Sequence, residues 1–464
     1  MTARPVVVET APLSPGQERL IDDEFARPDG TWPEAGEKTR LRPIDTGAVL
    51  IDGPLDTGAV QQAASALIVR QPALRTRLHR LADSTPLQLV ASTLPDQVHH
   101  SRLPGNTHPG RDVLLAQSLP RHVDPRSDPL FRTHLIRLAE HRHVLLLQIH
   151  HFVSDGWSIG VLYRDFAELY NAARTGRPAD LPPLPRTFAA VSRDMSTERR
   201  SARLGRQLAF WRQRLDNPGP ATTFTRQPVE QDGGRRPVNV QRVHVPAPAV
   251  AGLRASARGG ARGPLAGPFL AALALLLHHQ SAATDIRIGL MISNRARPDT
   301  ENLIGYFVNT AVIRLRLHPA LTAAALTEAA NEAVRQALEH QALPIQDLKR
   351  ELHQGAGAVP LYQVTLALNT MRTHTLTLDG VDCQDVEMEE TGPRLAPTTI
   401  EQRWVIEERA GALSGTLTYQ ACSFTPPQIR MALGHLDQAI AAVTAGHPTV
   451  AAITSAFRHP GATA

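Results

Sequence analysis

The sequence has very little cysteine and no long apolar run. Its 464 residues include only two cysteines, Cys383 and Cys422, and neither stands at a spacing typical of a metal site or a redox pair. Disulfide-stapled scaffolds are therefore disfavoured, and a reducing compartment is expected. No apolar run approaches the roughly 18 residues that a membrane span requires, and no charged-then-apolar leader opens the chain. We therefore expect a cytoplasmic protein without a membrane span.

Lysine is equally scarce, because Lys38 and Lys349 are the only two and arginine carries nearly all the positive charge. The formal net charge of +5 is mild, and the arginines are scattered along the chain. Nucleic-acid binding usually needs a concentrated basic face, so it is not expected. The small positive excess favours acidic protein partners instead.

The most informative stretch present is residues 149–158, Ile-His-His-Phe-Val-Ser-Asp-Gly-Trp-Ser. The short apolar run Val144–Ile149 before it predicts a buried strand. The apolar residues between Ile159 and Ala173 recur at helical spacing and predict an amphipathic helix after it. The polar residues therefore lie on a strand-to-helix turn, where a rigid scaffold often presents reactive side chains.

Such a turn can carry proton transfer. A histidine gains and loses a proton near neutral pH, Asp155 can fix its tautomer or anchor the loop, and Gly156 lets backbone approach a ligand closely. The same residues are equally consistent with two ordinary histidines at a strand end and an aspartate capping a helix. The pairs His99-His100 and His278-His279 lack the Asp-Gly that follows here. No cluster of cysteines or carboxylates accompanies the pair, so a metal site is not expected.

The pattern His-His-x-x-x-Asp-Gly resembles the active-site signature of the condensation domains of nonribosomal peptide synthetases. These domains belong to a wider acyltransferase superfamily that includes chloramphenicol acetyltransferase and wax ester synthases. Further stretches resemble the other blocks of the family in their usual order: residues 13–20, 70–76, 163–167, 208–212, 288–310, 339–348 and 360–364. The resemblance covers residues 13–444. Two departures, at Leu290–Arg295 and Pro397–Glu401, bear on the identity of the substrate rather than on the chemistry.

The resemblance implies an α/β (α+β) fold of two lobes similar to chloramphenicol acetyltransferase. The lobes would form a V-shaped pseudo-dimer with the active site in the tunnel between them. The chain is long enough for two cores. We place the lobes at residues 10–180 and 181–455, because Pro182–Pro185 follow the motif helix and prolines stop helices. Residues 1–9 are expected to be a loose tail.

Hydrophobic periodicity predicts the remaining elements. Strands are expected at Val238–Val245, Asp285–Ile292, Phe307–Leu315, Leu361–Asn369, Trp404–Glu408 and Leu413–Tyr419. Helices are expected at Val60–Val69, Gly267–His279, Leu321–Leu338 and Gln428–Val443. The chain ends soon after the last of these helices, so we expect a free-standing enzyme.

The resemblance also implies a reaction and its partners. A condensation enzyme joins a carrier-tethered acyl or aminoacyl thioester to an amine or hydroxyl acceptor, forming an amide or an ester. No cofactor of its own is expected. The phosphopantetheine arm of an acyl or peptidyl carrier protein, supplied in trans, presents the donor, and a small molecule is the acceptor.

Site residues follow from the matched blocks. His151 is expected to act as general base or to orient the nucleophile, and His150 to pack beneath the turn. Asp155 is expected to anchor the loop through an ion pair with Arg75 or Arg295. The Gly156 N–H is a candidate oxyanion donor. Candidate channel-lining residues are Trp157, Ser158 and Asn309.

Two other functions fit the sequence. One is an acyl-CoA-dependent O- or N-acyltransferase of the wax ester synthase or polyketide-associated type, which shares the core motif. The other is a non-catalytic docking module, which the intact His151, Asp155 and Gly156 argue against. Cyclising relatives carry aspartate in place of the first histidine pair and fit less well.

Overall fold

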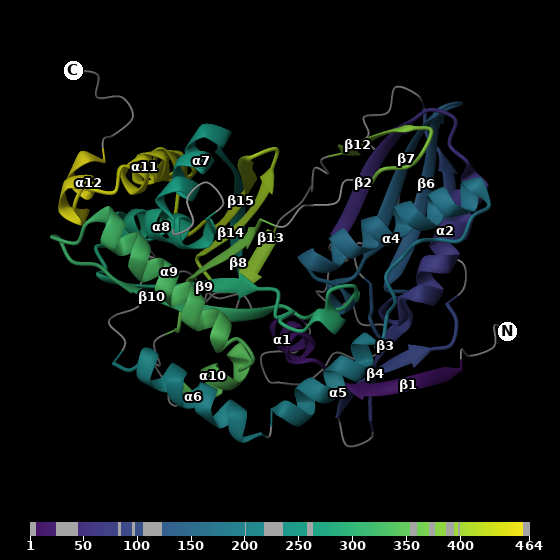
Figure 1. Ribbon diagram of the computed structural model, residues 1–464, viewed down its shortest axis with the longest axis horizontal. Coiled ribbons are helices and arrows are strands. Elements are labelled where there is room, and N and C mark those ends of the chain that lie inside the picture. Colours follow the sequence, from purple (N-terminus) through teal and green to yellow (C-terminus); the bar gives the residue numbers. More distant parts are fainter. Residues whose placement is uncertain are drawn as a thin grey trace. The chain divides into compact units, whose positions relative to one another are not determined.

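The computed structural model describes residues 6–24, 45–81, 85–94, 98–104, 123–199, 201–217, 235–257, 263–352, 360–370, 376–386, 394–397 and 400–457. Figure 1 shows its helices and strands. The chain divides into two compact units. The first unit comprises Met1–Ser201, Ser293–Val308 and Thr373–Gly392, and the second comprises Ala202–Ile292, Asn309–Arg372 and Pro393–Ala464.

The main sheet of the first unit is five-stranded, in the order β12-β2-β7-β6-β5. Its strands are β2 (Asp45–Asp52), β5 (Val98–Arg102), β6 (Phe131–Ala139), β7 (Arg142–Ile149) and β12 (Asp382–Val386). Helices α2 (Thr57–Arg70) and α4 (Gly156–Thr175) lie side by side on one face of this sheet (Figure 1). Apolar residues of the strands and of both helices share one core there.

The central strand β7 is buried on both faces, which explains its continuous apolar sequence. Side chains alternate across a strand. Leu145, Leu147 and Ile149 join the core beneath α2 and α4, whereas Val144 and Leu146 join a smaller cluster on the opposite face. The predicted strand before the motif is therefore confirmed, as is the predicted helix after it.

A smaller sheet in the first unit has the order β1-β4-β3. Its strands are β1 (Val7–Pro12), β3 (Thr76–Arg80) and β4 (Pro86–Ala91), all antiparallel. Helices α1 (Pro15–Glu24) and α5 (Phe188–Glu198) and the 3-10 turn η1 (Pro72–Arg75) belong to the same unit. The expectation of a tail through Glu9 was wrong, because Val7–Glu9 pair with β4 as part of β1.

The second unit has a seven-stranded sheet in the order β10-β9-β11-β14-β15-β8-β13. Its strands are β8 (Arg235–Val245), β9 (Asp285–Ile292), β10 (Asn309–Arg316), β11 (Val364–Asn369), β13 (Arg394–Pro397), β14 (Gln402–Arg409) and β15 (Ala412–Gln420). Its helices are α6 (Ala202–Arg214), α7 (Ala247–Ser256), α8 (Ala266–Ser281), α9 (Ala323–Glu339), α10 (Ile345–Leu352), α11 (Pro426–Ala445) and α12 (Val450–Ala456). Every residue of α8 from Gly267 to Leu277 is buried, so this helix is central to the core of the unit. The strands and helices predicted here are confirmed, with ends that move by a few residues.

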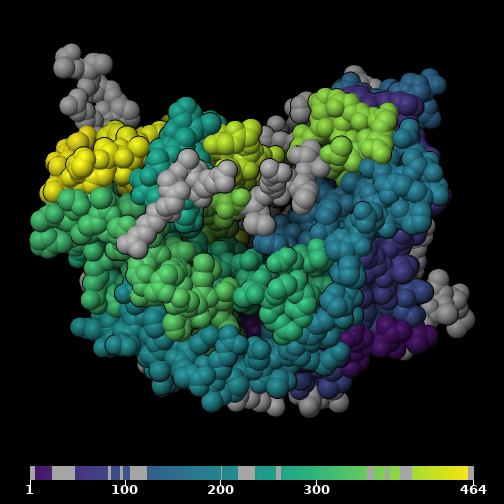
Figure 2. Space-filling view, in the orientation of Figure 1, coloured from purple at the N-terminus to yellow at the C-terminus, as the bar shows by residue number. Residues whose placement is uncertain are grey.

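Two later segments of the chain belong to the first unit. The strand β9 ends at Ile292 and its antiparallel neighbour β10 begins at Asn309. Between them the chain enters the first unit; we call Ser293–Val308 the return segment. Likewise β12 pairs with β2, and in Figure 2 its yellow-green residues lie at the surface beside blue and purple residues of the first unit. The predicted lobes 10–180 and 181–455 therefore need correction, because the first unit extends to Ser201 and includes both segments.

Candidate active site

The paired histidines have different surroundings. His150 is buried and its Nδ1 accepts a hydrogen bond from the backbone N–H of Phe152 at 2.9 Å. Its own N–H donates to the carbonyl of Leu130 at 2.8 Å, which ties the end of β7 to the residue before β6. His151 opens the 3-10 turn η2 (His151–Val153) and is only partly buried. The turn therefore uses His150 internally and leaves the His151 ring closer to its surface.

Asp155 ends the turn and begins the helix. It is the N-cap of α4, and its Oδ1 accepts hydrogen bonds from the N–H and the hydroxyl of Ser158, each at 2.8 Å. An aspartate at this position satisfies one of the N–H groups that the first turn of a helix leaves without a partner. The cap therefore fixes where α4 starts relative to His151.

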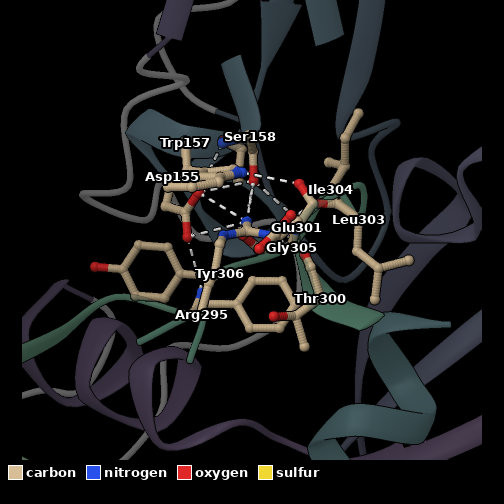
Figure 3. Close-up of polar contacts among 12 residues, drawn as sticks. Asp155, Trp157, Ser158, Arg295, Thr300, Glu301, Leu303, Ile304, Gly305 and Tyr306 are labelled. Atoms are coloured by element: carbon tan, nitrogen blue, oxygen red, sulfur yellow. Dashed lines mark hydrogen bonds and ion pairs between the residues drawn. The ribbon is translucent and has the colours of Figure 1, made fainter. Parts of the chain in front are cut away.

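The same carboxylate binds the return segment (Figure 3). Arg295 Nη2 donates to Asp155 Oδ1 at 3.1 Å, and the N–H of Phe307 donates to Asp155 Oδ2 at 3.0 Å. Ser158 Oγ also accepts from the N–H of Gly305 at 3.1 Å. One buried aspartate and one buried serine thus join the motif turn to a segment far away in sequence.

Both terminal nitrogens of Arg295 donate hydrogen bonds. Its Nη1 donates to the carbonyls of Thr300 at 2.6 Å and Leu303 at 2.8 Å, which folds the return segment around the guanidinium. The guanidinium carbon lies 3.9 Å from the centroid of the Phe307 ring, a cation–π contact. Burial lowers the pKa of Arg295, and the charge and hydrogen bonds of Asp155 oppose that shift. Its ordinary pKa is so high that it stays charged.

Of the two arginines expected as partners of Asp155, the structure places Arg295 there. Arg75 stands elsewhere, at the end of η1. Its guanidinium donates to the carbonyls of Ala91, of Ser92 at 3.0 Å and of Ile68 at 3.0 Å. Arg75 therefore joins η1 to α2 and to the end of β4.

The residues just after Asp155 differ in what they can do. Gly156 is the first residue of α4 and is exposed. The N–H groups in the first turn of a helix have no partner within the helix, and a Cβ built at Gly156 would meet no atom within 4 Å. Trp157 donates from Nε1 to the carbonyl of Glu301 at 2.8 Å (Figure 3), so its indole also holds the return segment.

Asn309, expected to line the channel, has a structural place in the second unit. Its Nδ2 donates to the carbonyls of Gln341 and Leu343, both at 2.8 Å, and its Oδ1 accepts from the N–H of Ile345 at 3.1 Å. The amide therefore joins the start of β10 to the loop between α9 and α10.

A buried polar network that the sequence did not predict lies beneath the turn. Gln17 Nε2 donates to the carbonyl of Phe152 at 2.9 Å, and Ser14 Oγ donates to the carbonyl of Tyr306 at 3.1 Å. Tyr306 in turn faces His151, with ring centroids 6.1 Å apart, and its hydroxyl accepts from Arg19 Nη2 at 2.8 Å. The sequence signal for this network is the family block at residues 13–20, which contains Ser14, Gln17 and Arg19.

Among the described residues, no group of three or more histidine, cysteine, aspartate and glutamate side chains is placed to hold a metal ion. The same residues include no helix that is both long and apolar enough to cross a membrane.

The fold is that of solved condensation domains, a class built on the chloramphenicol acetyltransferase fold. The model of the condensation-domain family matches residues 45–453. The chain belongs to this family, whose members are acyltransferases that form amide bonds in synthetases of the nonribosomal type.

Three similar proteins show how far the likeness extends. Phosphinothricin tripeptide synthetase PhsC of Streptomyces viridochromogenes is 33% identical over 420 residues, which cover 83% of this chain and 35% of that protein. The chain thus spans about a third of the length of this relative. The X-domain of teicoplanin biosynthesis has a TM-score of 0.74 at 23% identity, covering 98% of this chain and 97% of that one. The starter condensation domain of rhizomide synthetase has a TM-score of 0.75 at 18% identity, covering 95% and 96%.

Proposed function

We propose that this enzyme transfers an acyl or aminoacyl group from the phosphopantetheine thioester of an acyl or peptidyl carrier protein to a small-molecule acceptor. The acceptor presents an amine or a hydroxyl, and the product is an amide or an ester. The observation that carries the proposal is the position of His151. It is partly buried, and it lies on a turn that the buried Asp155–Arg295 ion pair holds in place. The cytoplasmic location and the absence of a resident cofactor stay predictions.

His151 has the role of base. Its imidazole takes a proton from the acceptor nitrogen or oxygen as that atom bonds to the thioester carbonyl carbon. The carbon–sulfur bond then breaks, and the leaving pantetheine thiolate takes up the proton. Thioester and amine thus give amide and thiol, with no oxidant or reductant. Proton removal matters more for a hydroxyl acceptor, because an ammonium loses its proton more easily.

Gly156 is the candidate donor to the developing oxyanion. Its N–H belongs to the first turn of α4, where the helix dipole also favours negative charge. His150 and Asp155 act by holding the turn, since both are buried and hydrogen-bonded within the first unit. Positioning of this kind can lower a barrier by many kcal/mol.

Two alternatives have specific support. The rhizomide starter domain was solved in complex with C8-CoA, which favours a CoA thioester as a second donor class. The teicoplanin X-domain was solved in complex with OxyB, which favours a docking role for this fold. Against pure docking, this chain retains His151, Asp155 and Gly156.

Mass spectrometry of loaded donors separates these functions. The enzyme is incubated with acyl groups on candidate carrier proteins or on CoA, together with a panel of amines and alcohols. We expect loss of the acyl group from the carrier and a matching amide or ester. Turnover of acyl-CoA alone, without any carrier, would favour the second donor class. No transfer from either donor would favour docking.

A further inference from the structure

A buried amide touches the return segment at two points. Gln71 follows α2 and is 1% exposed. Its Oε1 accepts from the N–H of Ile304 at 3.1 Å, and its Nε2 donates to the carbonyl of Asn302 at 3.0 Å. The two bonds grip the backbone on either side of Leu303, whose side chain is buried in the core. One side chain therefore bonds two backbone groups of the return segment.

Asp165 fixes the direction of that amide. This fully buried carboxylate of α4 accepts from Gln71 Nε2 at 2.9 Å, from Arg70 Nε at 2.9 Å and from Arg164 Nη2 at 2.7 Å. A carboxylate only accepts hydrogen bonds, so the amide must turn its NH₂ group toward Asp165. Its oxygen is then left to accept from Ile304. Arg164 adds a contact from Nη1 to Asn302 Oδ1 at 2.6 Å.

The residues that follow Ile304 are the ones that meet the motif turn. The N–H of Gly305 donates to Ser158 Oγ, the Tyr306 ring faces His151, and the N–H of Phe307 donates to Asp155. A displacement of about 1 Å far from the reacting atoms can reduce a rate by about a hundredfold. The hydrogen bonds of Gln71 to residues 302 and 304 therefore lie only two residues from Tyr306, whose ring faces His151.

We propose that Gln71 is a positioning residue that sets the register of the return segment against the His151 turn. The inference rests on the proposed function for its kinetic consequence. Its geometric part, the grip on residues 302–304, is independent of that function. The amide suits this role because it offers donor and acceptor together and does not titrate.

Three variants test the proposal. Gln71→Leu keeps the approximate size and removes all three bonds. Gln71→His keeps two of them when neutral, because one ring nitrogen can donate to Asp165 while the other accepts from Ile304. A protonated ring has no acceptor, so this variant loses the bond to Ile304 at low pH. Gln62→His, on the exposed side of α2, is the matched control.

We expect the kcat of Gln71→Leu to fall about tenfold or more, at temperatures where the protein is fully folded. Gln71→His should keep most of its activity at high pH and lose it as pH falls, relative to wild type and Gln62→His at the same pH. Wild-type kcat and KM in folded Gln71→Leu would overturn the positioning role. If that variant does not fold, a pH profile of Gln71→His parallel to that of wild type would overturn it instead.

Amide hydrogen exchange separates this inference from the proposed function. Exchange in a peptide covering residues 302–307 should quicken in Gln71→Leu and, at low pH, in Gln71→His, whether or not any substrate is turned over. Unchanged exchange would refute the grip itself. Exchange that quickens in Gln71→Leu, together with a wild-type protein that transfers no acyl group, would support the contact at residues 302–304 and refute the proposed function.

Discussion

The carboxylate of Asp155 lies 3.1 Å from the guanidinium of Arg295, although 140 residues separate them in the sequence. Their side chains are 1% and 0% exposed. Such a pair adds little net stability relative to apolar residues, but leaving one of its charges without the other is costly. The pair therefore makes the His151 turn and the return segment dependent on each other.

Asp155→Ala should unfold more easily as well as lose activity. It leaves Arg295 charged and buried, and breaking such a pair costs about 3–5 kcal/mol. Urea unfolding measures this loss. The control is Glu339→Ala, which removes one partner of the exposed Arg335 on α9 and should cost less than about 1 kcal/mol. An Asp155→Ala protein that unfolds like wild type but is inactive would mean that Asp155 acts directly in the chemistry.

Gly305→Ala should destabilise the return segment by overpacking. A Cβ at Gly305 would lie 2.3 Å from the ring of Phe188, which itself packs edge-on against Phe307. Overpacking of this kind typically costs about 1–3 kcal/mol. In Gly434→Ala, on helix α11, the new Cβ meets no atom within 4 Å, so this control should be neutral or stabilising. Calorimetry that ranks the two variants equally would contradict the packing described.

The stability of the protein should fall between pH 6.5 and pH 4 in a way that depends on His134. Burial, followed by the charges of His99 and Arg132, lowers the pKa of His134 to about 4. The unfolded chain therefore takes up this proton first as pH falls, and the difference amounts to roughly 3 kcal/mol at most. In His134→Gln the fall in unfolding free energy should be smaller. The same substitution at the exposed His100 should not reproduce that change, and equal pH dependence of wild type and His134→Gln would contradict the assignment.

Transfer from a carrier protein should weaken as salt rises. Carrier proteins are usually acidic around their modified serine, whereas this chain has a formal net charge of +5. Salt screens attraction between the two, with a Debye length of about 8 Å at physiological strength. The apparent KM for the carrier should rise across a salt series, while that for a short pantetheine thioester should change far less. Equal salt dependence for the two donors would point to apolar docking.

The motif turn and its flanking elements could be predicted because their signals are local. The run Val144–Ile149 and the helical spacing after it depend only on neighbours in sequence, and the bounds of β9 agreed at both ends. The choice between Arg75 and Arg295 could not be made that way. Both arginines match family blocks, and only the packing of η1 against α2 and β4 directs Arg75 to backbone carbonyls.

The boundary between the two units could not be predicted from the sequence for a similar reason. Because β9 and β10 are antiparallel neighbours, the sequence between them resembles an ordinary connection. The strand predicted from Phe307 begins instead at Asn309, because the N–H of Phe307 donates to Asp155 in the first unit. No local pattern reports a bond of that kind. The same holds for Gln71, whose three partners lie 94, 231 and 233 positions away.

In the proposed reaction, His151 activates or orients the acceptor. The most direct test measures the amide or ester formed by His151→Ala from a carrier-bound donor, with the fold checked by circular dichroism. We expect a folded variant that forms no product above the uncatalysed background at any pH. A folded His151→Ala enzyme that turns over near the wild-type rate would contradict it.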